Sequence, residues 1–260
     1  MKPGQRDMPL LDIRDVSMSF GGLEAIHRVN FGVAPKDLVG IIGPNGAGKT
    51  TLFNLITGFY PPDKGEIWYN GENITNLPMH KIAKKGVSRV FQINRIFLHL
   101  SVMENLVAGQ LIRSNKDSSF KLSTSYGMAS EEKERGDEIL ELLQLSHRKN
   151  DVAGNLPYGE QRRVAIGIAL MTEPVLLLLD EPAIGMNPLE NERIMGLIVD
   201  IRNKRGITIL IVEHNMKVIM GICDRVIVLN FGKIIADGSP GEIANNQEVI
   251  KAYLGGDQDA

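Results

Sequence analysis

The chain has 260 residues, of which 43% are hydrophobic, and its 29 basic side chains nearly balance 31 acidic ones. This length allows one sizeable core with a smaller attached lobe, and it argues against more than two independent domains. The near-neutral charge, without a long Lys/Arg run, speaks against a nucleic acid as the partner. The single cysteine, Cys223, excludes an internal disulfide and a cysteine-cluster metal site, and we interpret it as a small buried hydrophobic residue rather than a reactive thiol.

The N-terminal residues, Met1 to Pro9, are polar and lack the apolar core of a signal peptide. The longest apolar run, Val175 to Leu179, has the length of a strand and is far shorter than the ~20 residues that a membrane span needs. We therefore expect a soluble chain of a reducing cytoplasm that reaches any membrane only through a partner.

The first strands of the chain are expected to form a small antiparallel sheet. Leu10 to Val16 and Val29 to Val33 carry apolar and β-branched residues at short spacing, and Gly65 to Gly71 is a strand bounded by glycines. A buried strand at Leu38 to Ile42 comes between them. A helix is expected from Thr50 to Thr57, where Gly58 and the following prolines end it.

The segment between that buried strand and that helix fits the pattern G-x-x-x-x-G-K-[ST] of a phosphate-binding P-loop. Glycines let successive backbone N–H groups turn towards one anion, and the helix N-terminus adds partial positive charge. Lys49 would reach the β- and γ-phosphates and the Thr50 hydroxyl would ligate Mg²⁺. The nucleotide-binding residues predicted here are Gly43, Pro44, Asn45, Gly46, Ala47, Gly48, Lys49, Thr50 and Thr51.

The alternative for this segment is an ordinary glycine-rich turn before a helix. The pattern indicates a nucleotide but does not show what the nucleotide drives.

The middle third of the chain differs in its periodicity. Val102 to Ile112, Glu131 to Leu145 and Glu160 to Met171 have helix-like spacing and few β-branched residues. We expect an α-helical lobe here, inserted between the two halves of the sheet. The serine-rich segment Arg113 to Ser130 is interpreted as an exposed loop.

Continuous apolar runs at Val175 to Leu179 and Ile207 to Val212 are typical of strands covered on both faces. Together with the strand before the P-loop they predict a parallel α/β sheet. Arg225 to Leu229 and Lys233 to Ala236 predict a closing hairpin around a turn that contains Gly232.

The strand at Val175 to Leu179 ends in Asp180-Glu181-Pro182. A hydrophobic strand that delivers two carboxylates downstream of a P-loop is what Mg-nucleotide hydrolysis requires. Asp180 would hold the metal through water, and Glu181 would accept a proton from the attacking water or orient it. The alternative is a solvated strand end, which occurs in any α/β protein.

Three further motifs complete a resemblance to the ATP-binding subunits of ABC transporters, which covers about Leu11 to Tyr253. Leu156 to Arg163, between the P-loop and the acidic pair, resembles the signature loop usually written L-S-G-G-Q. Gln92, after Ser88-Arg89-Val90-Phe91, matches the Q-loop glutamine, and His214 matches the switch histidine.

The resemblance implies the fold class: an α/β P-loop NTPase with a RecA-like parallel sheet core, a small antiparallel β subdomain and an inserted α-helical subdomain. It implies a single ABC ATPase domain over residues 10–255. The catalytic core would comprise about residues 10–91 and 172–255, and the helical subdomain about residues 92–171.

The resemblance also implies roles for single residues, with ATP and Mg²⁺ as cofactors. Gln92 would ligate Mg²⁺ or the water at the hinge of the helical lobe, and His214 would sense the γ-phosphate. Phe20 would stack on adenine. The alternatives are a structural histidine and a plain core phenylalanine.

The resemblance thus implies a catalytic set, a metal-binding set and a set that serves a second subunit. The catalytic residues would be Lys49, Gln92, Glu181 and His214, and the metal ligands Thr50, Gln92 and Asp180. The signature residues, which would contact the nucleotide held by a second ATPase subunit, are Leu156, Tyr158, Gly159 and Glu160.

Two positions depart from the family pattern. The signature serine is Pro157, which removes a hydroxyl contact to the partner's nucleotide. The loop after Glu181 carries Asn187 where most members place Asp. Both departures bear on the dimer interface more than on ATP hydrolysis.

Within the family, the chain resembles the longer ATPase of branched-chain amino acid importers of the Liv type. The likeness rests on Tyr158 to Arg163, Gly185 to Pro188, the tail Asn245 to Gly255, and the position of the polar segment Arg113 to Ser130. A urea or amide importer, a lipopolysaccharide exporter and a soluble non-transport ABC ATPase remain as alternatives.

The resemblance implies partners and a location. We expect a head-to-tail dimer with an identical or different ATPase, two membrane permeases, and an indirect link to a periplasmic or lipid-anchored binding protein, with no nucleic acid. The chain would sit peripherally on the cytoplasmic side of the inner membrane. The segment Gln92 to Phe97 would dock a permease helix, the alternative being ordinary packing of the helical lobe.

Overall fold

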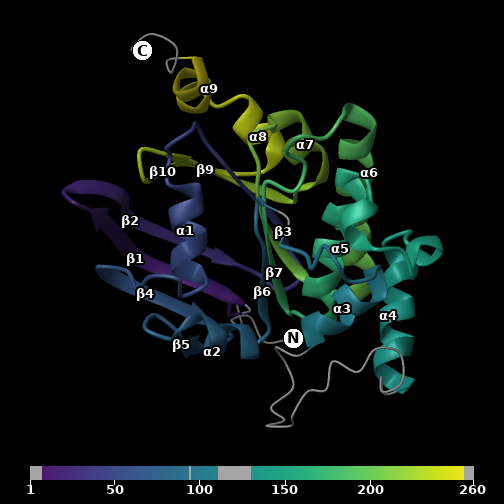
Figure 1. Cartoon of the computed structure of the whole chain (residues 1–260). Coiled ribbons are helices and arrows are strands. Elements are labelled where there is room, and N and C mark those ends of the chain that lie inside the picture. The colour runs from purple at the N-terminus through teal and green to yellow at the C-terminus, as the bar shows by residue number, and fades with distance from the viewer. Residues whose placement is uncertain (1–7, 94, 111–129, 255–260) are drawn as a thin grey trace, which may run out of the picture.

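The computed structural model describes residues 8–93, 95–110 and 130–254, which form two sheets with helices beside and between them (Figure 1). The predicted loop at 113–130 lies outside the described residues, except that Ser130 already begins a helix. The strands are β1 (Leu11–Phe20), β2 (Leu23–Val33), β3 (Leu38–Ile42), β4 (Lys64–Tyr69), β5 (Glu72–Asn73), β6 (Val87–Val90), β7 (Leu176–Asp180), β8 (Thr208–Val212), β9 (Arg225–Asn230) and β10 (Lys233–Gly238). The α-helices are α1 (Lys49–Ile56), α2 (Met79–Lys84), α3 (Val102–Gln110), α4 (Ser130–Leu142), α5 (Tyr158–Met171), α6 (Pro188–Arg205), α7 (Met216–Ile222), α8 (Pro240–Ala244) and α9 (Gln247–Leu254).

The larger sheet has six strands in the order β10-β9-β3-β8-β7-β6. Its inner strands pair in parallel, and only β10 joins antiparallel, through the predicted hairpin with β9. Every residue of β3, β7 and β8 is buried, because these strands are covered on both faces. The predicted parallel sheet is therefore confirmed, and its central strands all end at the same edge.

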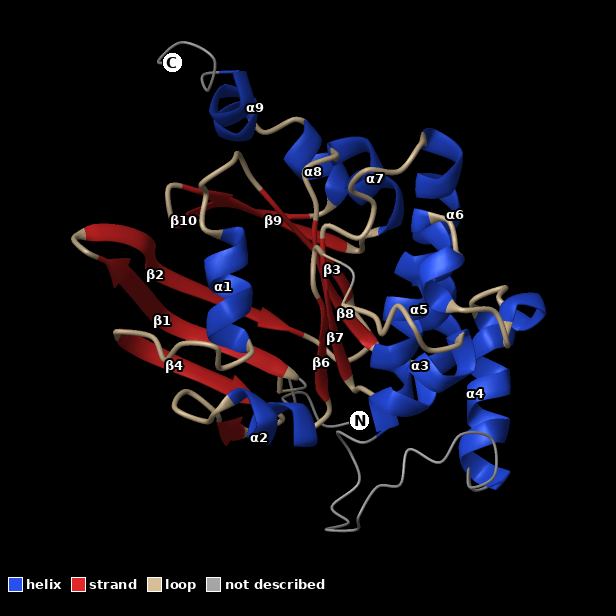
Figure 2. Ribbon diagram, in the orientation of Figure 1, coloured by secondary structure: helices blue, strands red, loops and turns tan. Residues whose placement is uncertain are grey.

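The smaller sheet is antiparallel, with the order β2-β1-β4-β5. Helix α1 lies between this sheet and the larger one (Figure 2), and its buried residues Leu52, Phe53, Leu55 and Ile56 join one hydrophobic cluster with both sheets. The helix ends as predicted, with Thr57 as its C-cap and Gly58 at a φ of +69°. Packing α1 between two apolar faces fixes the direction of its N-terminus, where the P-loop lies.

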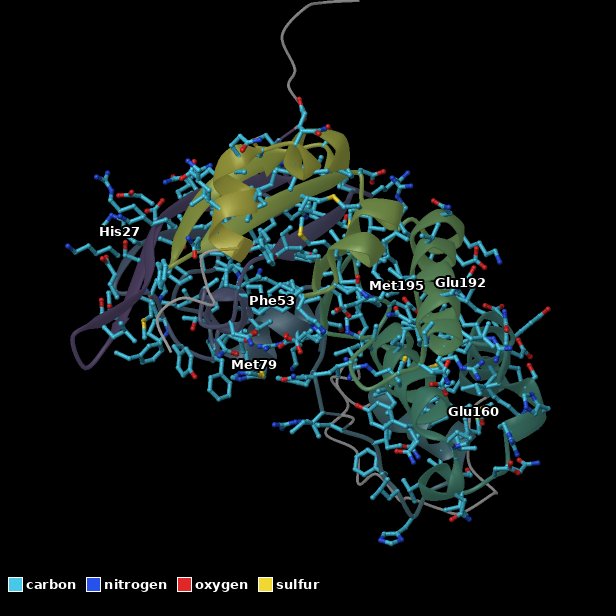
Figure 3. The ribbon with its side chains drawn as sticks, turned by 90° about the horizontal axis from the view of Figure 1, so that it is seen from above. His27, Phe53, Met79, Glu160, Glu192 and Met195 are labelled. Carbon is cyan, nitrogen blue, oxygen red and sulfur yellow. The ribbon has the colours of Figure 1, made fainter. Side chains whose placement is uncertain are left out.

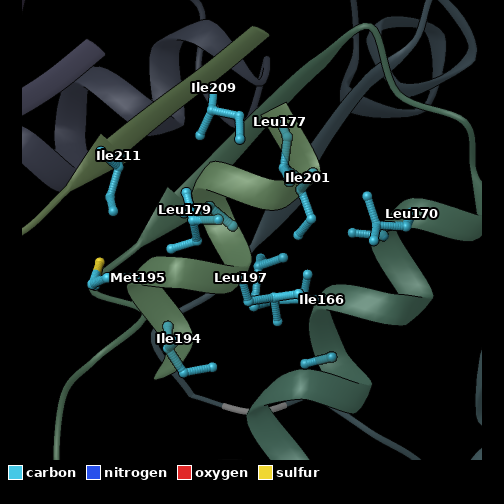
Figure 4. Packing of buried hydrophobic residues seen from close by; sticks show 14 of the residues in the cluster. Ile166, Leu170, Leu177, Leu179, Ile194, Met195, Leu197, Ile201, Ile209 and Ile211 are labelled. Carbon is cyan, nitrogen blue, oxygen red and sulfur yellow. The ribbon is translucent and has the colours of Figure 1, made fainter. Parts of the chain in front are cut away.

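Helices α3, α4 and α5 form the predicted helical part of the molecule. They share a second hydrophobic cluster with α6 and with the other face of the larger sheet. Figure 4 shows this packing, with Ile166 and Leu170 from α5 facing Leu197 and Ile201 from α6, and Leu177 from β7 above them in the view. The two clusters on opposite faces of the sheet hold its strand ends in place.

Two helix ends within the described residues differ from the prediction by two or three residues, each for a local reason. Helix α5 begins at Tyr158 rather than Glu160, because Pro157 supplies the extended N-cap conformation and its carbonyl accepts the first helical bonds. Helix α4 ends at Leu142 rather than Leu145, since Gln144 adopts a φ of +56° that stops the helix.

Cys223 is buried against the core, as predicted, and burial raises the pKa of its thiol to about 12. Among the helices of the described residues, none combines the length and the apolar character that crossing a membrane requires.

Candidate nucleotide-binding and catalytic site

The P-loop follows β3 and reaches α1 through three glycines with positive φ. Gly43, Gly46 and Gly48 have φ values of +154°, +79° and +104°. A Cβ at Gly43 would lie 2.1 Å from the carbonyl oxygen of Leu229, and a Cβ at Gly48 would lie 2.6 Å from that of Ala25. Backbone on both sides leaves no room for another residue type, so this loop geometry depends on glycine.

The nine residues predicted to bind nucleotide therefore lie on one strand-loop-helix segment, with Thr50 and Thr51 in the first turn of α1. Thr50 is exposed at that turn, where its hydroxyl is accessible to a ligand.

Lys49 is buried and its ammonium is held by the loop itself. Its Nζ donates to the carbonyl oxygens of Gly43 at 2.8 Å and Pro44 at 3.0 Å. Burial lowers the pKa of this ammonium, and the charges of Glu181 and Asp180 oppose that effect. Binding a phosphate at the loop would exchange two neutral acceptors for charged ones, which form stronger hydrogen bonds.

Glu181 follows β7 in a backbone conformation that is unusual for its residue type. Its φ is +46°, and its N–H donates to the Val212 carbonyl oxygen at 2.9 Å. Its side chain accepts a bond from Gln92, since Nε2 lies 2.7 Å from Oε2. The structure thus brings together two predicted site residues that are far apart in the sequence.

His214 lies at the end of the neighbouring strand β8. Its side chain is 55% exposed, and its Nδ1 lies 3.7 Å from Oε2 of the buried Glu213. Burial raises the pKa of the Glu213 carboxyl, while the backbone N–H of Ala183, which donates at 2.9 Å, opposes the rise. The His214 side chain is therefore accessible to a ligand, and the buried Glu213 carboxyl lies next to it.

Phe20, at the end of β1, is 42% exposed, which contradicts the alternative of a plain core phenylalanine. Its ring meets the Tyr60 ring edge-on, with centroids 5.5 Å apart and an interplanar angle of 76°. Tyr60 was not singled out by sequence reasoning, and its neighbour Phe59 packs against it in turn at 4.8 Å. An aromatic group open to solvent suits stacking on a base.

The signature residues make their contacts within the helical part and with α6. A Cβ at the buried Gly159 would lie 3.2 Å from Oε1 of Glu190 on α6. Glu160, which is labelled in Figure 3 on the helical side of the molecule, pairs with Arg148 at 3.2 Å. Leu156 is buried and Tyr158 is half exposed.

Arg162 is the largest fully buried side chain among the described residues, and sequence reasoning missed it. From α5 it donates to backbone carbonyls of the Q-loop and of the turn after β7. The acceptors are Phe91 at 2.5 Å, Gln92 at 3.0 Å, Asp180 at 2.8 Å, Glu181 at 2.9 Å and Pro182 at 3.2 Å. An arginine on the same helix face as the buried Ile166 and Leu170 was the signal that could have found it.

Asp180 is also buried, at the end of β7, and accepts a short hydrogen bond from Arg89. Together with Thr50 and Gln92 it offers hard oxygen donors of the kind that Mg²⁺ prefers. Within the described residues there is no cluster of three or more His, Cys, Asp or Glu side chains able to hold an ion. Mg²⁺ in nucleotide sites typically uses one or two carboxylates together with substrate phosphates, so the donors present fit this ion.

A family model described as ABC transporter matches residues 26–184, which is more than half of the chain. The chain belongs to the ABC transporter family. A second model, described as branched-chain amino acid ATP-binding cassette transporter, matches residues 233–259. The predicted family, and with it the predicted class of enzyme, an ABC-type ATPase, is confirmed.

Among its relatives is the high-affinity branched-chain amino acid transport ATP-binding protein BraF of Pseudomonas aeruginosa. It is 45% identical over 250 residues, which cover 95% of this chain and 98% of the relative. The fold resembles that of MJ1267, an ATP-binding cassette of an ABC transporter, in its ADP conformation, with a TM-score of 0.86 and 33% identity over 95% of this chain and 99% of that one. The predicted fold class is therefore confirmed.

A dimeric cassette, MJ0796 bound to ADP and Pi, is also similar. Its TM-score is 0.75 at 25% identity, covering 88% of this chain and 98% of that chain.

Proposed function

We propose that this ABC ATPase powers the import of branched-chain amino acids through partner permeases. The observation that carries the proposal is the bond between Gln92 and Glu181 beside a complete P-loop, which assembles the groups needed to hydrolyse ATP. The amino acid specificity rests on the relatives that carry this function in their names and on the C-terminal family match.

In this proposal each predicted residue has a defined task. Lys49 turns from the loop carbonyls to the β- and γ-phosphates, and Glu181 accepts a proton from the attacking water. His214 hydrogen-bonds the γ-phosphate, and Phe20 stacks on adenine. When bound, Mg²⁺ would neutralise phosphate charge, held by Thr50, Asp180 and Gln92.

The signature residues would complete the P-loop site of a second ATPase subunit. Among them, Tyr158 at the start of α5 has a ring that is exposed to solvent and is therefore accessible to a second subunit. Pro157 offers no hydroxyl to the partner's nucleotide, so the closed site has fewer contacts than it would have with a serine. The second subunit is either an identical or a different ATPase. A head-to-tail dimer of this kind places two nucleotides at one interface.

A docking surface for the permease is proposed beside Gln92. A cavity of about 240 Å³ lies between α2, β6 and α5, with Phe91 and Arg95 on its wall. Phe97 is 55% exposed, while Ile96 packs against the core. The Phe97 backbone is held by Asn105, which accepts from its N–H at 2.7 Å and donates to its carbonyl at 2.9 Å. An exposed aromatic ring on a fixed backbone suits a partner helix.

We also propose a location for the chain and the bounds of its domain. The chain would lie peripherally on the cytoplasmic side of the inner membrane, connected through the permeases to a periplasmic or lipid-anchored binding protein. We propose one ATPase domain over residues 10–255, with the helical subdomain at about residues 92–171.

The function is tested by replacing Glu181 with Gln in the chain expressed with its permease subunits. The amide keeps the shape but cannot accept a proton, so ATP should still bind while hydrolysis falls by ~10²-fold or more. Uptake of labelled leucine, isoleucine and valine should be lost with it. Wild-type uptake by the Glu181→Gln variant would contradict the role of Glu181, and wild-type chain that imports none of the three amino acids would contradict the substrate assignment.

A further inference from the structure

Arg89 connects three elements of the candidate site, β6, β7 and α1. It lies on β6 with its side chain only 5% exposed, and its Nη2 lies 2.6 Å from Oδ2 of Asp180 at the end of β7. Its Nη1 donates to Oδ1 of Asn54 on α1 at 2.7 Å. One guanidinium therefore bridges the helix that follows the P-loop and the acidic end of the central sheet.

The plane of this guanidinium is fixed by its surroundings. Its central carbon lies 4.7 Å from the centroid of the Phe91 ring and 5.5 Å from that of Phe53. Phe53 is labelled in Figure 3, as is Met79 on the wall of the neighbouring cavity. The Nε of Arg89 is buried without a hydrogen-bond partner. An arginine held by two rings and two acceptors has little freedom to turn, so the Asp180 carboxylate that it binds is also fixed.

We propose that Arg89 is the positioning residue of the metal site: it holds Oδ2 of Asp180 so that the carboxylate presents its other oxygen to Mg²⁺ bound with ATP. This inference rests on the metal role proposed for Asp180. Partners outside the ligands orient metal-binding carboxylates in this way, and their loss typically lowers metal affinity by about 10- to 100-fold.

The same arginine lines the cavity between α2, β6 and α5. The proposed permease surface and the metal site thus share one residue. A displacement of this cavity wall would reach the Asp180 carboxylate through a single side chain, without passing through Gln92.

The test measures Mn²⁺ binding to the full-length chain with ATP by electron paramagnetic resonance, with Mn²⁺ as a probe for Mg²⁺. Arg89→Met should weaken Mn²⁺ binding by about 10- to 100-fold. Arg89→Lys, which can reach only one of the two acceptors, should fall between this variant and the wild type. ATP affinity in the presence of a chelator should be unchanged, and raised Mg²⁺ should restore hydrolysis. Unchanged Mn²⁺ affinity in a folded Arg89→Met variant would overturn the inference.

Arg95→Met is the matched control, because the Arg95 guanidinium packs 4.7 Å from the same Phe91 ring and lines the same cavity, but is exposed. It should bind Mn²⁺ as the wild type does, and an equal loss in this control would overturn the inference. Should Arg89→Met fail to fold, Asn54→Ala removes one acceptor of Arg89 from within α1, and a normal Mn²⁺ affinity in that variant would contradict the proposal.

Asp180→Asn distinguishes the metal role of Asp180 from the positioning role of Arg89. If this variant binds Mn²⁺ as tightly as the wild type, the metal role of Asp180 is wrong, and the inference falls with it. If it loses Mn²⁺ while folded Arg89→Met does not, only the role of Arg89 is wrong.

Discussion

Glu181 combines a proposed chemical task with a strained backbone. A glutamate with a φ of +46° costs about 1–3 kcal/mol relative to an ordinary conformation. The strain persists because the Glu181 N–H is bound to Val212 and its carbonyl accepts from the buried Arg162. These bonds turn the chain sharply after β7, so that Asp180 and Glu181 occupy different positions at the strand end.

The buried Glu213 predicts a dependence of stability on pH. Burial raises the pKa of its carboxyl in the folded state above the ordinary value of 4.5, so the folded state holds the proton more tightly than the unfolded state. Its contribution to stability is complete below that ordinary value and is lost as pH rises through the raised pKa. Glu213→Gln lacks this titration. Urea unfolding should therefore show the variant gaining stability relative to the wild type as the pH rises from 4.5 through the raised pKa.

A difference in unfolding free energy between Glu213→Gln and the wild type that stays constant over this range would contradict the raised pKa. Changes in the overall charge of the protein affect both chains and cancel in the comparison.

At the scale of single elements, the start of α6 accommodates Asn187 where most family members place Asp. Asn187 is the N-cap of α6: its Oδ1 accepts from the Glu190 N–H at 3.0 Å, and Glu190 Oε2 accepts from the Asn187 N–H at 3.1 Å. Asn and Asp cap helices about equally well, so Asn187→Asp should leave the free energy of unfolding nearly unchanged. Asn187→Ala should lower it by about 1 kcal/mol in denaturant titrations.

Ser239→Ala is the matched control for this prediction, because Ser239 and Glu242 form the same reciprocal cap at α8. It removes a cap far along the chain from the loop after Glu181. Both alanine variants should lose stability, and an Asn187→Ala variant as stable as the wild type would show that the cap contributes nothing there.

The elements that local chemistry determines could be predicted from the sequence. The P-loop follows from its glycines, β7 and β8 from continuous apolar runs, and the hairpin of β9 and β10 from the turn at Gly232. The helix ends at Tyr158 and Leu142 could not be placed as well, because they depend on a proline cap and on one residue with positive φ.

The site was predicted as a set of residues but not as a set of contacts. Gln92 and Glu181 are 89 residues apart, and Arg89 and Asp180 are 91 apart. Their contacts follow from the strand order, in which β6 lies beside β7, and this order is a property of the whole sheet. Arg162 was overlooked because a charged residue beside Arg163 suggests a solvated helix face, whereas it is in fact fully buried.

At the scale of the whole molecule, one P-loop and one signature segment in each chain predict an ATP-dependent dimer. Glu181→Gln should dimerise on adding ATP and stay monomeric without it, since unhydrolysed nucleotide stabilises only the closed form. Light scattering over a range of concentrations measures this. A monomer at every concentration, even with the partner ATPase present, would contradict the head-to-tail arrangement.

The assembly with a membrane partner gives the last prediction. Phe97 follows the cavity-lining Arg95 by two residues, and it is exposed while Asn105 holds its backbone. Phe97→Glu should therefore place a charge in the proposed interface without disturbing the fold. Co-purification with the permeases and amino acid uptake should both be lost, and ATP binding should be kept. Leu23→Glu, at the exposed first residue of β2, is the control and should still assemble. If Phe97→Glu assembles as Leu23→Glu does, the permease docks elsewhere on the chain, because a buried unpaired carboxylate in a helix-docking surface costs too much free energy for the complex to form normally.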